Sequence, residues 1–145
     1  MIPSSILAQN SKRLMVFCGR SNPDLGQKIA DQLQIKLGDI ETTTFSNGEI
    51  YVRYRENIRG SDVFLIQATS QPVNENLVEL LIMIQAARLA SALRITGVMP
   101  WLGLCSQGTK SAGREPISAK LVAQSLHVGG GDRERPSDPQ QCRGR

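Results

Sequence analysis

The sequence predicts an α/β fold, in which a mostly parallel sheet is flanked by helices. Short, continuous apolar runs, typical of strands buried on both faces, alternate with longer segments of helical periodicity. One region instead alternates apolar and polar residues around an Asn-Gly pair, which is the pattern of a β-hairpin. The chain has 145 residues, enough for one domain with a substantial core but not for a second full domain.

The first strand and helix are predicted near the start of the chain. Residues 14–18, "LMVFC", form a continuous apolar run that ends at a turn, "GRSNPD". Asn22 suits a helix N-cap and Pro23 suits the first helical position. The apolar residues of this segment recur every four positions: Leu25, Ile29 and Leu33. We therefore expect a strand, a turn and a helix that ends near Gln34.

A hairpin and another buried strand are predicted next. Residues 40–45 have the composition of a strand, and residues 50–54 alternate with period two after "SNGE". This arrangement predicts a β-hairpin inserted between the parallel strands. Residues 63–67, "VFLIQ", form a further continuous apolar run and predict a strand of the parallel sheet.

Two helices and one strand complete the expected fold. A long helix is predicted over residues 75–92, with a broad apolar face. Residues 94–99, "RITGVM", predict a strand that ends before Pro100. The last helix is expected from Pro116 to Val128, where three glycines follow. In such folds, ligands bind near the carboxyl ends of the parallel strands.

The two ends of the chain differ from its middle. Residues 1–12 have too short an apolar run for a signal peptide, and we expect them to be an extension before a domain of residues 13–131. Residues 132–145 contain four Arg, two Pro and three acids, but no Val, Ile, Leu, Phe or Met. This segment has almost nothing apolar to bury, so we expect a disordered tail.

Composition argues against several classes of partner. The net charge of +4 is modest, aromatic residues are 4% of the chain and basic residues form no long run, so no nucleic-acid partner is expected. Polar residues interrupt the longest apolar stretch, which argues against a membrane span. Three cysteines without a CxxC pair suit a reducing compartment, so a cytoplasmic protein is expected.

Two loops contain candidate binding residues. Residues 45–49, "FSNGE", are by themselves most simply a hairpin turn. Residues 101–114, "WLGLCSQGTKSAGR", follow a predicted parallel strand and contain Lys110 and Arg114, whose charges suit phosphate oxygens. A solvated loop without a ligand remains the open alternative for this segment. His127, the single histidine, has no visible acidic or thiol partner, so no catalytic or metal-binding residue is predicted.

Several segments together resemble a known family. The segments "FSNGEIYV", "ENIRGSDVFLIQ", "NENLVELLIMIQAARLASA", "RITGVMP" and "REPISAKLVAQ" are similar, in this order and spacing, to the amino-terminal half of ribose-phosphate diphosphokinase, also called phosphoribosyl pyrophosphate synthetase. The resemblance implies a phosphoribosyltransferase-like fold. It also implies transfer of the β,γ-diphosphoryl group of ATP to ribose 5-phosphate with Mg²⁺, in subunits that form dimers and hexamers.

The resemblance assigns ATP binding to the hairpin. The family's adenine-binding phenylalanine, Asn or Asp, and glutamate match Phe45, Asn47 and Glu49, and Gly48 belongs to the same motif. In the family these residues reach the ATP of a neighbouring subunit. An aromatic face can stack on adenine, while amide and carboxylate groups can bond its polar edge.

The resemblance also assigns ATP binding to the loop after residue 100. Gln107 and Lys110 match family positions, and Arg114 adds a further basic group. Ser106, however, occupies the position of a family arginine, and the two residues after Gln107 replace an acid and a base. A lost charge-assisted hydrogen bond costs about 1.5 to 3 kcal/mol, so weakened ATP binding is expected.

The chain departs from the family after "GGDR", where "ERPSDPQQCRGR" replaces a buried strand and a motif with an Mg²⁺-binding histidine. A domain without its carboxyl-terminal strand, its second domain and its ribose 5-phosphate site is therefore predicted. We expect a truncated, inactive chain, through a shifted reading frame or as a natural short form. An uncovered sheet edge would favour self-association or association with full-length synthetase. The alternatives are a non-catalytic interaction subunit that joins intact family members, and an unrelated nucleotide-binding module.

Overall fold

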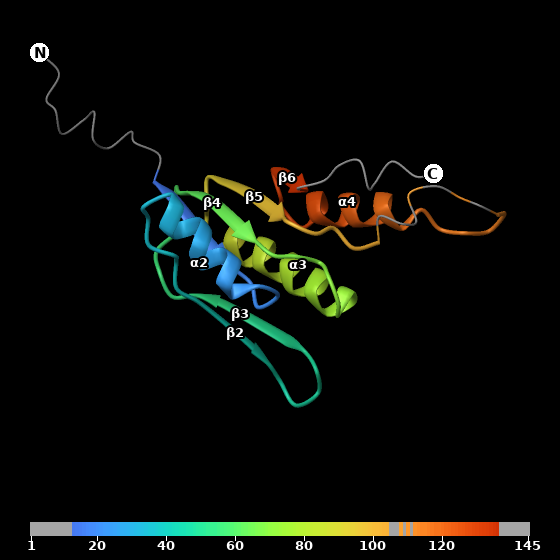
Figure 1. Ribbon diagram of the computed structural model, residues 1–145, viewed down its shortest axis with the longest axis horizontal. Helices are drawn as coiled ribbons and strands as arrows, with labels where there is room; N and C mark the ends of the chain where they lie inside the picture. Colours follow the sequence, from blue (N-terminus) through green and yellow to red (C-terminus); the bar gives the residue numbers. More distant parts are fainter. Residues whose placement is uncertain (1–12, 105–107, 109, 111, 137–145) are drawn as a thin grey trace, which may run out of the picture.

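The computed structural model describes residues 13–104, 108, 110 and 112–136 (Figure 1). The elements follow the order β1 (Leu14–Cys18), α2 (Pro23–Gln32), β2 (Ile40–Thr44), β3 (Ile50–Tyr54), β4 (Asp62–Ile66), α3 (Val73–Leu89), β5 (Arg94–Met99), α4 (Ser118–Val128) and β6 (Arg133–Pro136). Among these residues, no helix is both long and apolar enough to cross a membrane.

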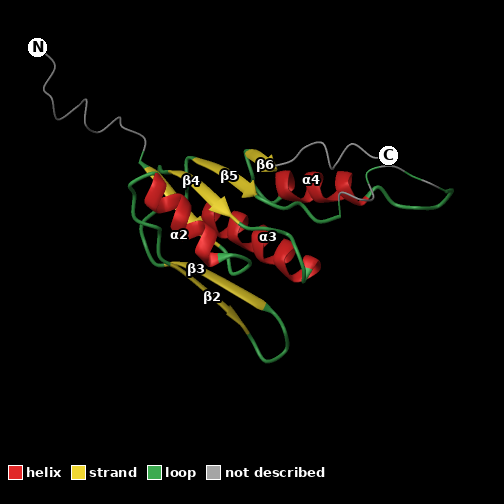
Figure 2. Ribbon diagram, viewed as in Figure 1, coloured by secondary structure: helices red, strands yellow, loops and turns green. Residues whose placement is uncertain are grey.

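The strands form one parallel sheet and one separate hairpin. The sheet has the order β1-β4-β5-β6, with all three neighbouring pairs parallel, and β2 pairs with β3 in an antiparallel hairpin (Figure 2). The predicted α/β fold, with a hairpin inserted between parallel strands, is confirmed.

The core lies between one face of the sheet and α3. Phe17, Leu65 and Ile95, from three neighbouring strands, are fully buried against Leu80 and Ile84 of this helix. Burying one such side chain contributes about 1.5–3 kcal/mol. The alternate residues of the strands point to the other face, where an apolar cavity is lined by strand residues, by Ile29 of α2 and by Leu33, which caps this helix. The two helices therefore lie against opposite faces.

The base of the hairpin is fixed to this core through Tyr54. Its ring meets the Phe17 ring edge-on, with the centroids 4.8 Å apart. Its hydroxyl donates a hydrogen bond of 2.8 Å to the carbonyl of Met83 in α3. Burial raises the pKa of Tyr54 well above its ordinary value, so the hydroxyl keeps the proton that makes this bond.

The predicted helices differ from the observed ones by a few residues at their ends. α2 stops at Gln32, because Leu33 is its C-cap and Gln34 has a positive φ of 55°, which no helix continues. α3 begins at Val73, earlier than the apolar periodicity predicts. α4 begins at Ser118, with Ile117 as its N-cap.

Strand β6 corrects the expectation for the first part of the tail. Arg133–Pro136 pair with β5, and Thr96 lies opposite Arg133. Parallel pairing uses backbone groups and needs no apolar side chain, so composition alone missed this strand. A proline can occupy an edge strand such as β6. The β5 edge that was predicted to be uncovered is therefore paired along these four residues. Residues 1–12 and 137–145, predicted to be an extension and a tail, lie outside the described residues.

Asp132 fixes the start of β6. Its backbone N–H donates to the Ile95 carbonyl at 2.9 Å, and its carboxylate accepts bonds from the Ile95 N–H at 2.8 Å and from Arg88 Nη2 at 2.9 Å. Burial alone would raise the pKa of Asp132, but the bonds from Arg88 and Ile95, with the charges of Arg88 and Arg94, together hold this pKa below its ordinary value. The ionised carboxylate is therefore stabilised by folding.

We expect Asp132→Asn to lower the free energy of unfolding by under about 1 kcal/mol at pH 7, because the ion pair with Arg88 is partly exposed. The pKa of Asp132 is lower in the folded chain, so its contribution is present above the unfolded-chain pKa of about 3.9 and is lost as the pH falls through the folded pKa. Urea unfolding of the wild type and of Asp132→Asn, at pH 7 and at low pH, measures the loss of stability and its dependence on pH. Asp31→Asn, which changes a carboxylate bonded to the neutral Gln27 amide, is the control. A difference between wild type and Asp132→Asn that persists unchanged at low pH would contradict the assignment.

Candidate functional site

The hairpin tip is a tight turn that brings Phe45 and Glu49 together. The Phe45 N–H donates to the Glu49 carbonyl at 2.8 Å, and the Gly48 N–H donates to the Phe45 carbonyl at 2.9 Å. Asn47 Oδ1 accepts a bond from the Glu49 N–H at 3.1 Å. Gly48 has a φ of +91°, in the region that favours glycine. The local turn thus accounts for the presence of Asn47 and Gly48.

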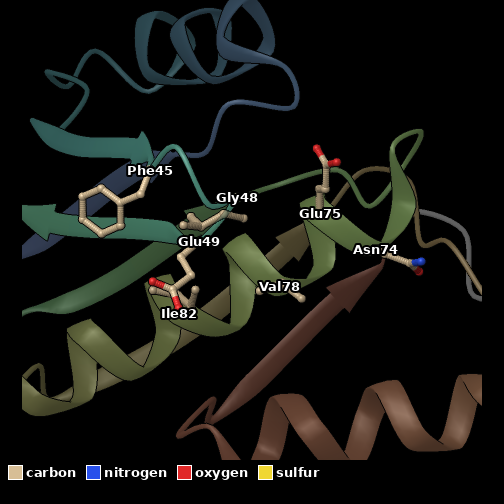
Figure 3. A pocket seen from close by; sticks show the side chains of 8 residues that line it. Phe45, Gly48, Glu49, Asn74, Glu75, Val78 and Ile82 are labelled. Carbon is tan, nitrogen blue, oxygen red and sulfur yellow. The ribbon is translucent and has the colours of Figure 1, made fainter.

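A pocket of about 470 Å³ lies between the hairpin tip and the first half of α3 (Figure 3). Its walls are formed by Phe45, Gly48, Glu49, Ile50, Asn74, Glu75, Val78 and Ile82. Figure 3 shows the Glu49 side chain extending from the hairpin toward α3. This volume is in the range of small-molecule sites. The structure therefore brings three of the predicted residues, Phe45, Gly48 and Glu49, to one pocket, whereas Asn47 is not part of its wall.

The chemistry of the pocket is apolar and acidic. Phe45 is 50% exposed and offers an aromatic surface, to which Val78 adds an aliphatic one. The charged residues of the wall are two carboxylates, Glu49 and Glu75. Carboxylates accept hydrogen bonds and repel anions, so this wall suits a flat ring with N–H donors and not a phosphate group.

The predicted residues of the second loop lie elsewhere. Figure 1 shows residues 112–117, the described stretch that leads into α4, extending past the start of α4 and away from the hairpin tip. Lys110 and Arg114 are exposed, and Arg114 has a positive φ of 67°. Ser106 and Gln107, also predicted to bind ATP, lie outside the described residues. Within one chain, the hairpin and the described part of this loop do not form a common site.

Sequence reasoning missed a polar network where β1 and β4 end. The Glu79 carboxylate of α3 accepts bonds from the Arg20 backbone N–H at 2.8 Å and from Arg20 Nε at 2.9 Å. Beside it, Gln67 Oε1 accepts bonds from the Ser21 hydroxyl at 2.7 Å and from the Ser21 N–H at 3.2 Å. Two polar residues inside apolar segments, Gln67 and Glu79, were the available signal.

This network is packed without space for a further atom at Gly19. A Cβ at this position would lie 2.1 Å from Gln67 Oε1 and 3.0 Å from Glu79 Oε1. The glycine therefore permits the amide and the carboxylate to approach the β1–α2 turn closely. The network lies at the carboxyl ends of the strands, where α/β proteins bind ligands, and next to the hairpin.

The described residues form no preformed metal-binding cluster. Within these residues, no group of three or more His, Cys, Asp or Glu side chains is placed to hold a metal ion. Mg²⁺, which the resemblance implies, is therefore assigned no ligand in this part of the chain.

Comparison with known proteins identifies the domain. The sequence model of the N-terminal domain of ribose phosphate pyrophosphokinase matches residues 14–130. Ribose-phosphate pyrophosphokinase 1, chloroplastic, of Oryza sativa is 51% identical over 125 residues, which are 86% of this chain and 32% of that protein. The ribose-phosphate pyrophosphokinase of Clostridium perfringens is 50% identical over 127 residues, which are 88% of this chain and 40% of that protein. The chain thus spans well under half the length of these relatives.

A solved structure agrees with the sequence comparison. The crystal structure of phosphoribosylpyrophosphate synthetase from Mycobacterium smegmatis matches with a TM-score of 0.86 and 43% identity, over 88% of this chain and 43% of that one. The match of the family model covers most of the chain, from β1 to the end of α4. The chain therefore belongs to the ribose-phosphate pyrophosphokinase family and contains its N-terminal domain.

Proposed function

We propose that this domain binds the adenine ring of ATP at the hairpin tip. The observation that supports the proposal is the pocket at the tip, which combines the half-exposed ring of Phe45 with the carboxylate of Glu49. The aromatic face stacks on the base, and the carboxylate accepts a bond from the exocyclic amino group. Asn47 contributes to this proposed site indirectly. Its side-chain oxygen accepts a hydrogen bond from the Glu49 N–H and so stabilises the turn that presents Glu49.

The triphosphate of the same ATP requires cations that the pocket wall does not offer. Lys110 and Arg114 are the candidates in the described part of the second loop, and Ser106 and Gln107 join them in the proposal. Because the described part of this loop next to α4 extends away from the hairpin of its own chain, we place the phosphates on the loop of a neighbouring subunit (Figure 1). The site proposed here is then complete only in an oligomer, with this chain or with a full-length synthetase as the neighbour.

The reaction proposed for the whole protein is diphosphoryl transfer from ATP to ribose 5-phosphate. For residues 1–145 alone we propose no turnover, since ribose 5-phosphate and Mg²⁺ are assigned no site among the described residues. The second candidate function is that of a non-catalytic interaction subunit. The half-exposed Phe45 and Val78 favour it, because they present apolar surface at the pocket. A cytoplasmic location stays a prediction, since the rice relative is named as chloroplastic.

Phe45→Ala tests the adenine site. We expect the affinity for ATP to fall about tenfold or more, because stacking of a base on an aromatic ring contributes about 1–3 kcal/mol. The free energy of unfolding should change little, because the ring is half exposed. Titration calorimetry measures the affinity, and thermal unfolding measures the stability.

Leu121→Ala is the matched control for this variant, because Leu121 is an apolar residue on α4 that is 62% exposed and is not part of the pocket wall. This control should bind ATP as the wild type does. If Phe45→Ala and the wild type bind ATP equally well, the adenine site lies elsewhere.

A further inference from the structure

We propose that Arg20 is a positioning residue, which holds the hairpin tip in the orientation that the pocket requires. Part of this inference, the effect on ATP, rests on the proposed function. The orientation of the tip does not rest on it and can be measured without a nucleotide.

The first step of the argument is a rigid anchor on α3. The side chain of Glu79 is 3% exposed, and its two oxygens accept separate bonds from Arg20, at 2.8 Å from the backbone N–H and 2.9 Å from Nε. The lack of a Cβ at Gly19 lets this carboxylate lie close to the β1–α2 turn. Arg20 is thus fixed at both its backbone and its guanidinium.

The second step is the bond from Arg20 to the hairpin. Arg20 Nη2 donates to Thr44 Oγ1 at 3.0 Å, and Thr44 is the last residue of β2, directly before Phe45. The guanidinium therefore bonds α3 through one nitrogen and the hairpin through another. A lysine has one nitrogen on a flexible stem and cannot reproduce this fork.

The third step is the lack of burial at the tip. Residues 45–49 are all exposed, so burial in the core does not fix them, although the Phe45 ring lies against the Tyr51 ring with the centroids 5.8 Å apart. The base of the hairpin is anchored by Tyr54 on Met83, at the opposite end of the two strands. The hydrogen bond from Arg20 thus lies at the boundary between the buried part of the hairpin and its exposed tip, where the pocket begins.

Thr44→Val is the variant that tests this role. It removes the acceptor of Arg20, while it leaves the Arg20–Glu79 pair intact and places a good strand-forming residue in β2. Thr44→Ser retains a hydroxyl and is the matched rescue variant. Changing Arg20 itself is less informative, because that change also leaves the buried Glu79 without its partner.

Two measurements are made on the full chain. Backbone ¹⁵N relaxation of residues 45–49, without nucleotide, reports the mobility of the tip. Titration with ATP reports binding. In Thr44→Val we expect lower order parameters at residues 45–49 than in the wild type, unchanged values at Tyr54, and an ATP affinity reduced about three- to tenfold, in line with the net contribution of one exposed hydrogen bond. Thr44→Ser should restore both.

The outcomes separate this inference from the proposed function. Equal tip mobility in wild type and Thr44→Val overturns the positioning role, whatever ATP does. Increased mobility in Thr44→Val that Thr44→Ser does not restore also overturns it, because the hydroxyl is then not the cause. If the wild type does not bind ATP, the proposed function fails, and the relaxation data alone decide whether Arg20 positions the tip.

Discussion

The purified polypeptide of residues 1–145, given ATP, ribose 5-phosphate and Mg²⁺, is expected to form no phosphoribosyl pyrophosphate above a no-protein control. Phosphoryl transfer depends on positioning both substrates and on neutralising the phosphate charge with metal ions and cationic side chains. The charged groups of the pocket wall are carboxylates, which repel phosphate groups. With the proposed function above, we expect the loss to be complete.

The control for this experiment is a full-length member of the family, assayed in the same buffer. Product formed by residues 1–145, in a preparation free of host synthetase, would contradict the prediction. Mixing the two proteins also tests the second candidate function. An interaction subunit should change the turnover or the mass of the full-length enzyme, whereas a chain that does not associate leaves both unchanged.

The strands and helices that bury apolar residues were predictable from the sequence. Residues 14–18 form a strand as predicted, because a continuous apolar run must be covered on both faces. Strand β6 was not predictable in the same way, since it pairs with β5 through backbone groups and its sequence, RERP, contains no continuous apolar run. The composition of residues 132–136 did not reveal the hydrogen bonds of their backbone.

The candidate site was predictable in part. The Asn-Gly turn indicated the position of the hairpin tip, and the resemblance implied the role proposed for it, but neither indicated the pocket wall on α3. Val78 and Ile82 occur in the predicted helix as ordinary apolar residues. The contact between Arg20 and Glu79 joins residues 59 positions apart, so no local pattern contains it. Long-range polar contacts of this kind require the fold before they can be identified.

The second large effect is expected when Arg20 is replaced by Met. The variant removes the guanidinium and leaves the Glu79 carboxylate, which is 3% exposed, with the Arg20 backbone N–H as a remaining donor. Removing one partner of a buried ion pair costs about 3–5 kcal/mol. Because the Arg20 backbone N–H still bonds the carboxylate, we expect the free energy of unfolding to fall by about 3 kcal/mol, near the lower end of that range. The melting temperature should fall by about 10 °C.

Glu79→Gln should cost much less, although it breaks the same ion pair. The Arg20 side chain is 44% exposed and can be solvated by water, while the amide oxygen of Gln can still accept the Arg20 backbone N–H. A loss of about 1 kcal/mol is expected.

The double variant Arg20→Met/Glu79→Gln should therefore be more stable than Arg20→Met alone, because the buried charge is gone. Urea unfolding of the wild type, the two single variants and the double variant at pH 7 measures this double-mutant cycle. A larger loss for Glu79→Gln than for Arg20→Met would mean that the carboxylate is not the costly buried group, and that solvent or another donor compensates it once Arg20 is removed.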